Sequence, residues 1–301
     1  MHLKEASSRL IGKEMQPALQ RRWMTTPLNS VRFLLIVLLL LPWAAASRGQ
    51  SAPALSTAQS QALEQQALAT EVRTAQDASH PMRYRLHRST PRLRSTKEII
   101  ETRDGDVARL LTIDGQPLTQ AADQKEQARL DALLNDPGQQ QHRRKAEEED
   151  SGIVLKLLRM LPHAFLYEYT GSSDGVEKFR FRPNPNFVPP DLETQALTAM
   201  TGEIWINASE KRVTRLEGHL QQDTNYAWGI LGKLDKGGWV VIEQANVGGG
   251  QWRIVHVQMK MDLRILFKTK NIDTTEEMSG YAPVPAGIDY RQAIQMLRAG
   301  R

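Results

Sequence analysis

The clearest pattern in the chain is an alternation of apolar and polar residues within 253–268. From Val255 to Lys268, polar or charged side chains fill every second position, with Leu266 as the exception, and apolar side chains fill the others. The apolar set is Val255, Val257, Met259, Met261, Leu263, Ile265 and Phe267. A period of two is typical of a β-strand with one buried face. A straight strand over this run would be about 45 Å long. We therefore expect either a tight turn near Met261–Leu263 or one long strand across a curved sheet.

The second half of the chain is predicted to be an antiparallel meander. Short alternating segments are separated by turns rich in glycine and by a proline-rich loop at 183–190. Strands are expected at 165–169, 176–182, 202–207, 212–221, 239–247 and 252–270, with a short helix at 192–200.

Helical patterns lie mainly before this meander. Residues 119–134 and 140–161 are the main helical segments, and a short helix is expected at 290–298. The second segment places Ile153, Val154, Leu157, Leu158 and Leu161 on one face. We expect Pro162 to end it. A hairpin is expected over 99–113, around Asp104-Gly105.

These elements together predict an α+β fold with the helices on one face of an antiparallel sheet.

An apolar run at residues 33–46 predicts export from the cytoplasm. The run is shorter than the roughly 20 residues that a membrane-spanning helix needs. Arg32 precedes it, Pro42 interrupts it, and Ala44 and Ala46 fit a signal peptidase site. We expect a signal peptide over 1–46, cleavage near Ala46/Ser47, and a periplasmic or secreted protein. The pattern leaves translation starts at Met1, Met15 and Met24 open.

The composition after the leader divides the chain further. Residues 47–81 are rich in Ala, Gln and Ser and are interpreted as a partly helical linker, followed by a single domain over 82–301. The leader carries six Lys/Arg and two acidic residues, so 33 basic and 32 acidic residues remain. This near-neutral balance does not support nucleic-acid binding. The absence of cysteine excludes disulfides, thiolate metal sites and a lipid-modified cysteine.

The segment 82–94 is locally basic and has three interpretations. A strand with arginines on its solvent-exposed face is favoured, and the alternatives are a nucleic-acid groove and peripheral contact with anionic lipid headgroups. The arginines concerned are Arg83, Arg85, Arg88, Arg92 and Arg94.

One sequence matches a catalytic motif, Gly171-Ser-Ser-Asp-Gly175. The Gly-x-Ser-x-Gly nucleophile elbow requires a strand before it and a helix after it. Residues 176–182 instead alternate like a second strand, so we favour a hairpin turn around Ser173. The seven histidines show no metal-ligand spacing. We therefore predict no catalytic residue, no metal site and no cofactor.

Aromatic and sulfur-containing residues supply the candidate ligand site. Core packing is the commoner role for such residues, and a ligand cavity is the alternative. The candidate ligand-binding residues are Trp205, Leu216, Trp228, Trp239, Val257, Met259, Met261 and Phe267.

The run Met200-Thr-Gly-Glu-Ile-Trp-Ile-Asn207, followed by Arg212-Val-Thr-Arg-Leu-Glu-Gly218, resembles paired strands of the outer-membrane lipoprotein carrier superfamily. The resemblance covers residues 82–285 in layout and 200–218 in motif. It implies a strongly curved antiparallel sheet, an incomplete β-barrel, with helices packed on its concave face. The greater length and the loop at 183–190 depart from the family pattern, and the family's ligand-contacting residues have no assigned positions in this chain.

Three functions remain open at this point. The first is an envelope protein that binds or carries a lipid, a lipoprotein or another apolar ligand. The second is a structural or interaction module whose core is filled by its own helices. The third, least favoured, is a secreted serine hydrolase.

Overall fold

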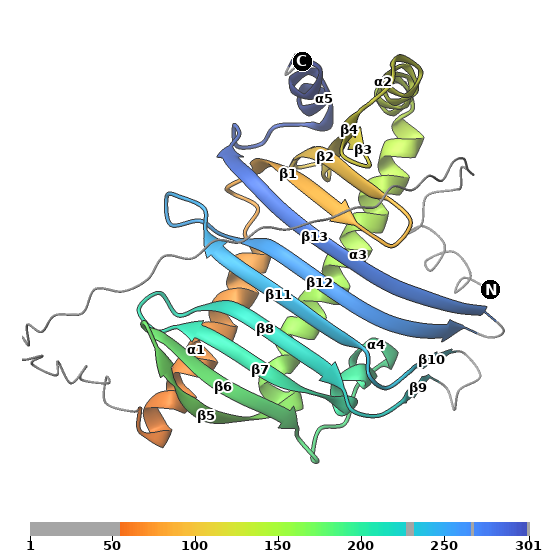
Figure 1. Cartoon of the computed structure of the whole chain (residues 1–301). Coiled ribbons are helices and arrows are strands. Elements are labelled where there is room, and N and C mark those ends of the chain that lie inside the picture. Colours follow the sequence, from red (N-terminus) through yellow and green to blue (C-terminus); the bar gives the residue numbers. More distant parts are fainter. Residues whose placement is uncertain (1–54, 227–231, 266–267, 300–301) are drawn as a thin grey trace, which may run out of the picture. The chain divides into compact units, whose positions relative to one another are not determined.

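The computed structural model describes residues 55–226, 232–265 and 268–299. Over these residues the fold is α+β, with five α-helices and an antiparallel sheet of 13 strands (Figure 1). The strand path runs from β4 to β5 without closing into a barrel. The predicted α+β class is therefore confirmed at this level.

The sheet joins the two halves of the chain through its last strand. The strand order is β4-β3-β2-β1-β13-β12-β11-β8-β7-β6-β5, and the short pair β9–β10 extends from β12. Because β1 pairs with β13, the strands β1–β4 from the first half of the chain join the meander of the second half in one sheet. The strands are β1 (Met82–Ser89), β2 (Arg94–Ile100), β3 (Val107–Ile113), β4 (Gln116–Pro117), β5 (Phe165–Ser173), β6 (Val176–Pro183), β7 (Met200–Asn207), β8 (Arg212–Leu220), β9 (Thr224–Tyr226), β10 (Gly232–Leu234), β11 (Trp239–Asn246), β12 (Trp252–Ile265) and β13 (Lys268–Pro283).

The first 14 residues of the strand expected at 252–270 form one long strand, and the expected end at 270 is wrong because Lys268 already belongs to β13. β12 runs from Trp252 to Ile265, so the alternative of a turn near Met261–Leu263 is wrong. The chain reverses after Ile265, and β13 returns beside β12. β13 was missed beyond residue 270 because it carries polar residues on both faces, as in Asp273-Thr-Thr-Glu-Glu277.

Five helices accompany the sheet. They are α1 (Thr57–Gln76), α2 (Gln120–Asn135), α3 (Pro137–Ala164), α4 (Leu192–Gln195) and α5 (Tyr290–Ala299), and a 3₁₀ turn over Ala196–Ala199 follows α4. Capping side chains set three of the starts, since Ser56, Thr119 and Asp136 each accept a backbone N–H at the N-terminus of α1, α2 or α3. Pro162 lies inside α3, which continues to Ala164, so the predicted end at Pro162 is wrong by one half-turn.

The larger core lies between one face of the sheet and the helices α1 and α3, which lie behind the sheet in Figure 1. We call this face of the sheet the α3 face. The core contains Leu63, Ala67, Leu68, Leu161, Ala164, Phe165, Phe179, Phe181, Leu197, Ile204, Ile206 and Val213. The segment 47–81, interpreted as a linker, therefore includes a helix at 57–76 that is part of the fold. The polar composition of this segment did not indicate that the helix packs on the sheet, because its inner face also carries Ser60, Glu64 and Glu71.

A second core lies on the opposite face, at the end of the sheet formed by β2 and β3. Ile100 and Val107 contact α2 and α5 there, and their register places them on the side away from α1 and α3. The two cores thus use both faces of one sheet, at opposite ends of the strand order.

Candidate functional site

The register of the central strands aligns a row of apolar side chains on the α3 face. Val257 and Met259 of β12 lie opposite Ile242 and Val240 of β11. On the other side, Met259 and Met261 lie opposite Thr274 and Ile272 of β13. We call the half-buried residues of this region the apolar strip. It consists of Leu86, Val255, Val257, Met259, Met261, Ile272 and Met278.

The same face is divided into a filled part and an incompletely covered part. Over β6 and β7, Phe179 is 2 % exposed and Ile204 is 1 % exposed, because α1 and the C-terminal half of α3 cover them. Across β12, β13 and β1, by contrast, the apolar strip is only half-buried. The coverage by helices therefore becomes incomplete towards the centre of the sheet.

The middle of α3 explains this difference. Positions 140, 147, 154 and 161 are seven residues apart and lie on one line of the helix. Gln140 and Leu161 are buried and Glu147 is half-buried, but Val154 on the same line is 55 % exposed. Residues 148–154 are all exposed. The two ends of α3 are therefore anchored, while its central turns do not pack on the sheet.

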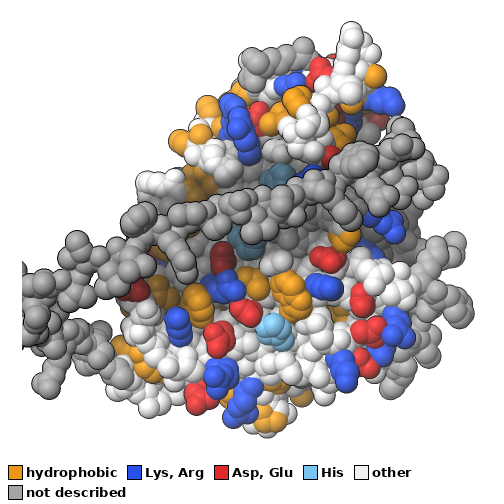
Figure 2. All heavy atoms as spheres, in the orientation of Figure 1, with side chains coloured by type: hydrophobic (Ala, Val, Ile, Leu, Met, Phe, Trp, Pro, Cys, Tyr) orange, Lys and Arg blue, Asp and Glu red, His pale blue; other side chains and the backbone are white. Residues whose placement is uncertain are grey.

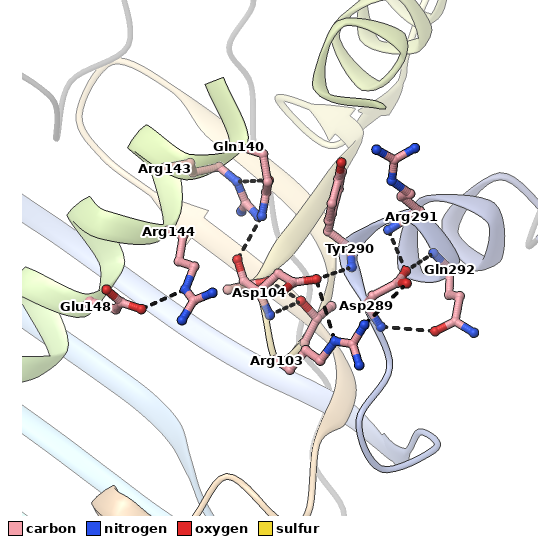
Figure 3. Close-up of polar contacts among 12 residues, drawn as sticks. Arg103, Asp104, Gln140, Arg143, Arg144, Glu148, Asp289, Tyr290, Arg291 and Gln292 are labelled. Carbon is pink, nitrogen blue, oxygen red and sulfur yellow. Dashed lines mark hydrogen bonds and ion pairs between the residues drawn. The ribbon is translucent and has the colours of Figure 1, made fainter. Parts of the chain in front are cut away.

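Figure 3 shows the anchor at the N-terminal end of α3. Gln140 donates to the carbonyl of Asp104 in the β2–β3 turn at 2.7 Å. The carboxylate of Asp104 also accepts the backbone N–H of Tyr290, and Arg103 lies 3.8 Å from Asp289 at the start of α5. The β2–β3 turn thus ties the first turns of α3 and α5 together.

A second anchor fixes the C-terminal half of α1. Glu71 forms an ion pair with Arg212 of β8 at 3.0 Å, with both side chains less than a tenth exposed. The same carboxylate accepts the backbone N–H of Val213 and the amide of Gln244. The Arg212 guanidinium also lies over the ring of Trp252. These contacts hold α1 against β8 and β11.

Charged groups border the apolar strip at β1, β2 and β13. Arg88 lies 3.3 Å from Glu276, which is the register partner of Val257. Lys97 of β2 lies opposite Leu86 on the same face. Burial lowers the pKa of Lys97, and the positive charge of Arg88 adds to the effect. The site therefore combines an apolar strip with a cationic margin.

The predicted ligand residues fall into three groups. Leu216, Val257, Met259 and Met261 lie on the α3 face. Trp205 and Trp239 lie on the opposite face, because their register partners are Arg215 and His219. Trp228 and Phe267 lie outside the described residues. The structure therefore does not bring the predicted set into one site.

Trp205 is part of a polar surface. Lys178 lies 4.3 Å from the centre of its ring and Arg215 lies 5.2 Å from it. Charged side chains of both signs spread over this face of the sheet, as Figure 2 shows. Both cations contact the ring through cation–π interactions, so Trp205 is less suited to stacking on a ligand.

Sequence reasoning missed Leu86, Met278, Lys97 and the role of Val154. Their positions depend on the pairing of β1 with β13, which links residues far apart in the chain. Leu86, an apolar residue within the basic segment, was a local signal for a second side of the site.

The five arginines of the basic segment do not form one patch. Arg83 and Arg88 lie on opposite faces of the sheet and pair with Glu98 and Glu276. Arg85, Arg92 and Arg94 are exposed and make no ion pair within the part of the chain that the structure describes. Peripheral membrane contact through these residues stays a prediction.

Ser173 occupies the hairpin that the pattern favoured. β5 ends at Ser173, Asp174 and Gly175 form the turn with positive φ angles, and β6 begins at Val176. The Ser173 hydroxyl donates to Asp174. A strand follows where the nucleophile elbow requires a helix.

Among residues 55–226, 232–265 and 268–299, no three His, Asp or Glu side chains are grouped to hold a metal ion. No helix in those ranges has the length and apolar character needed to cross a membrane. No protein-family model matches the chain, and no curated protein or solved structure is significantly similar to it.

Proposed function

We propose that this chain is an exported cell-envelope protein that binds an apolar ligand, such as an acyl chain, between the apolar strip and the middle of α3. One observation carries the proposal. Val154 lies on the inward line of α3 and is nevertheless 55 % exposed, and α3 runs behind the central strands of the sheet (Figure 1), whose apolar side chains are themselves only half-buried. Exposed apolar surface on two facing elements is the usual condition for an apolar binding site.

The proposed geometry is that of a curved sheet with its helices on the concave face. The filled part over β6 and β7 fixes α1 and the C-terminal half of α3, while the incompletely covered part receives the ligand. Burial of an acyl chain contributes about 0.8 kcal/mol per methylene group. The burial of the methylene groups of an acyl chain therefore supplies enough free energy to offset the entropy that the acyl chain loses on binding.

Export rests on the leader. The apolar run at 33–46 and the small residues before Ser47 support cleavage there and delivery to the periplasm or the exterior. The resemblance of residues 200–218 to the lipoprotein carrier superfamily agrees with this location and stays a prediction.

The second candidate is an interaction module with a self-filled core. The observation in its favour is the complete burial of Phe179, Ile204 and Ile206 beneath α1 and α3. In that case the apolar strip has no ligand, and the exposed middle of α3 contacts only solvent. The two candidates differ in one measurable property, the binding of an apolar probe.

We expect Val154→Asp to weaken binding of the neutral fluorescent probe N-phenyl-1-naphthylamine by at least about tenfold, which is about 1.4 kcal/mol. The substitution places a charge beside the apolar strip, and burying that charge under the probe is unfavourable. Because Val154 is exposed, its replacement should hardly change the stability of the fold. The measurement is a fluorescence titration of the mature chain.

Gly152→Asp is the matched control. It introduces the same charge two residues earlier, at an exposed position about 160° around the helix, and should leave probe binding unchanged. An equal loss in both variants, or the absence of probe binding in the wild type, would contradict the proposed site.

A further inference from the structure

A half-buried lysine, Lys97, lies at one end of the apolar strip. Lys97 of β2 pairs in register with Leu86 of β1, and Leu86 pairs with Met278 of β13. His256 pairs with Glu277, so Val255 of β12 continues the same row beyond Met278. Three interstrand steps of about 4.8 Å place Lys97 about 14 Å from Val255. The row therefore leads from apolar side chains to an ammonium group.

The carboxylates near Lys97 already bind other groups. Glu276 forms an ion pair with Arg88 at 3.3 Å. Glu126 of α2 lies 2.7 Å from Arg129 and accepts the backbone N–H of Leu110 at 2.9 Å. Within the described residues, Lys97 itself makes no hydrogen bond or ion pair. Arg88 and Arg129 both act on Lys97 as neighbouring positive charges.

Lys97, Arg88 and Glu276 thus lie on the α3 face beside the apolar strip, two cations against one carboxylate. The half-buried Lys97 ammonium has lost hydration, and among the described residues only the electrostatic attraction of Glu126 and Glu276, with no hydrogen bond, compensates for it. A carboxylate or phosphate oxygen would supply a charge-assisted hydrogen bond at this position. The same anion would also reduce the repulsion that Arg88 exerts on Lys97.

We propose that the ligand is an amphipathic anion whose compact carboxylate or phosphate head binds Lys97, with Arg88 beside it, while its apolar tail lies along the strip. This inference rests on the proposed function and adds the chemical class of the ligand. The ligand therefore binds in one orientation, with its head group at β2 and its tail extending towards β12.

The test is isothermal titration calorimetry of the mature chain with three probes that share one tail. The probes are dodecanoate, dodecyl phosphate and 1-dodecanol. We expect at least one anion to bind about tenfold or more tightly than the alcohol. Lys97→Met should abolish this preference and leave the affinity for the alcohol unchanged, because the tail contacts remain.

Lys260→Met is the matched control for the loss of one positive charge. Lys260 is exposed on the opposite face of β12 and should leave all three affinities unchanged. A preference for dodecanoate identifies a carboxylate head, and a preference for dodecyl phosphate identifies a phosphate head. Either result supports the proposal.

Two other results would overturn parts of the account, and they are distinguishable. Equal binding of the anions and the alcohol, unaffected by Lys97→Met, would refute the anionic head while leaving the apolar site intact. Failure of all three probes to bind would refute the proposed function together with this inference.

Discussion

Replacing Arg212 with methionine should destabilise the fold by about 3–5 kcal/mol, the usual cost of leaving one partner of a buried ion pair alone. The Arg212 and Glu71 side chains are 7 % and 8 % exposed, so the remaining carboxylate has little access to water. Arg212 also contacts Gln244 and the ring of Trp252, and both contacts disappear with it. Urea unfolding followed by circular dichroism measures the effect.

Arg144→Met is the matched control for this variant. Arg144 pairs with Glu148 at 2.7 Å on the exposed surface of α3, where an ion pair adds little to stability. The double variant Glu71→Leu, Arg212→Met should recover much of the loss, because no charge stays buried. If Arg212→Met unfolded at the same urea concentration as Arg144→Met, α1 would not be fixed to the sheet by this ion pair.

The second large effect depends on pH and comes from Glu64, which is buried on the inner face of α1. Burial raises the pKa of Glu64 from 4.5 to about 7. Its Oε1 atom has no hydrogen-bond partner among the described residues. The Tyr167 hydroxyl, a neighbouring titratable group, donates to the carbonyl of Leu161. The carboxyl group is therefore accommodated best in its neutral form.

The raised pKa fixes the direction of the effect. The contribution of neutral Glu64 to the free energy of unfolding is complete below pH 4.5 and is lost as the pH rises through about 7. The reason is that Glu64 ionises at a lower pH in the unfolded chain than in the folded protein. Between pH 5 and pH 8 the free energy of unfolding should fall by about 2–3 kcal/mol on this account. Glu64→Gln should remove this fall, as measured by urea unfolding at the two pH values.

Asp106 adds a second pH-dependent contribution to the free energy of unfolding, since burial raises the pKa of Asp106 to about 7 as well. The comparison therefore uses Asp106→Asn alone and combined with Glu64→Gln. Glu148→Gln, at an exposed position of α3, serves as the control and should keep the wild-type profile. A wild-type profile that survives in Glu64→Gln would show that α1 does not bury this carboxyl group in solution.

The sequence predicted elements whose pattern is local. The alternation in β12 predicted which of its side chains face the helices, because the strand's own sequence separates its apolar face from its polar face. The register with β11 and β13 places apolar neighbours beside several of these apolar residues. The hairpin turn around Ser173 was likewise predictable from short-range chemistry.

Elements that depend on distant partners were not predictable in this way. α1 places Glu64 and Glu71 inward, so polar residues interrupt the apolar residues on its inner face. The burial of Glu71 is explained only by Arg212, which is far along the chain. In β13, Glu276 lies on the face that packs towards the helices, and its position there is explained by its ion pair with Arg88 of β1. The strand period also could not show that Trp205 and Met259 belong to opposite faces, since that depends on the register across several strands.

Native mass spectrometry of the protein purified without detergent from its own cell envelope tests the central claim most directly. The account predicts a chain that begins near Ser47 and carries the added mass of an anionic amphiphile. The added mass should be absent in Val154→Asp and present in Gly152→Asp. A folded wild-type chain with no added mass would contradict the ligand-binding account and favour the self-filled module.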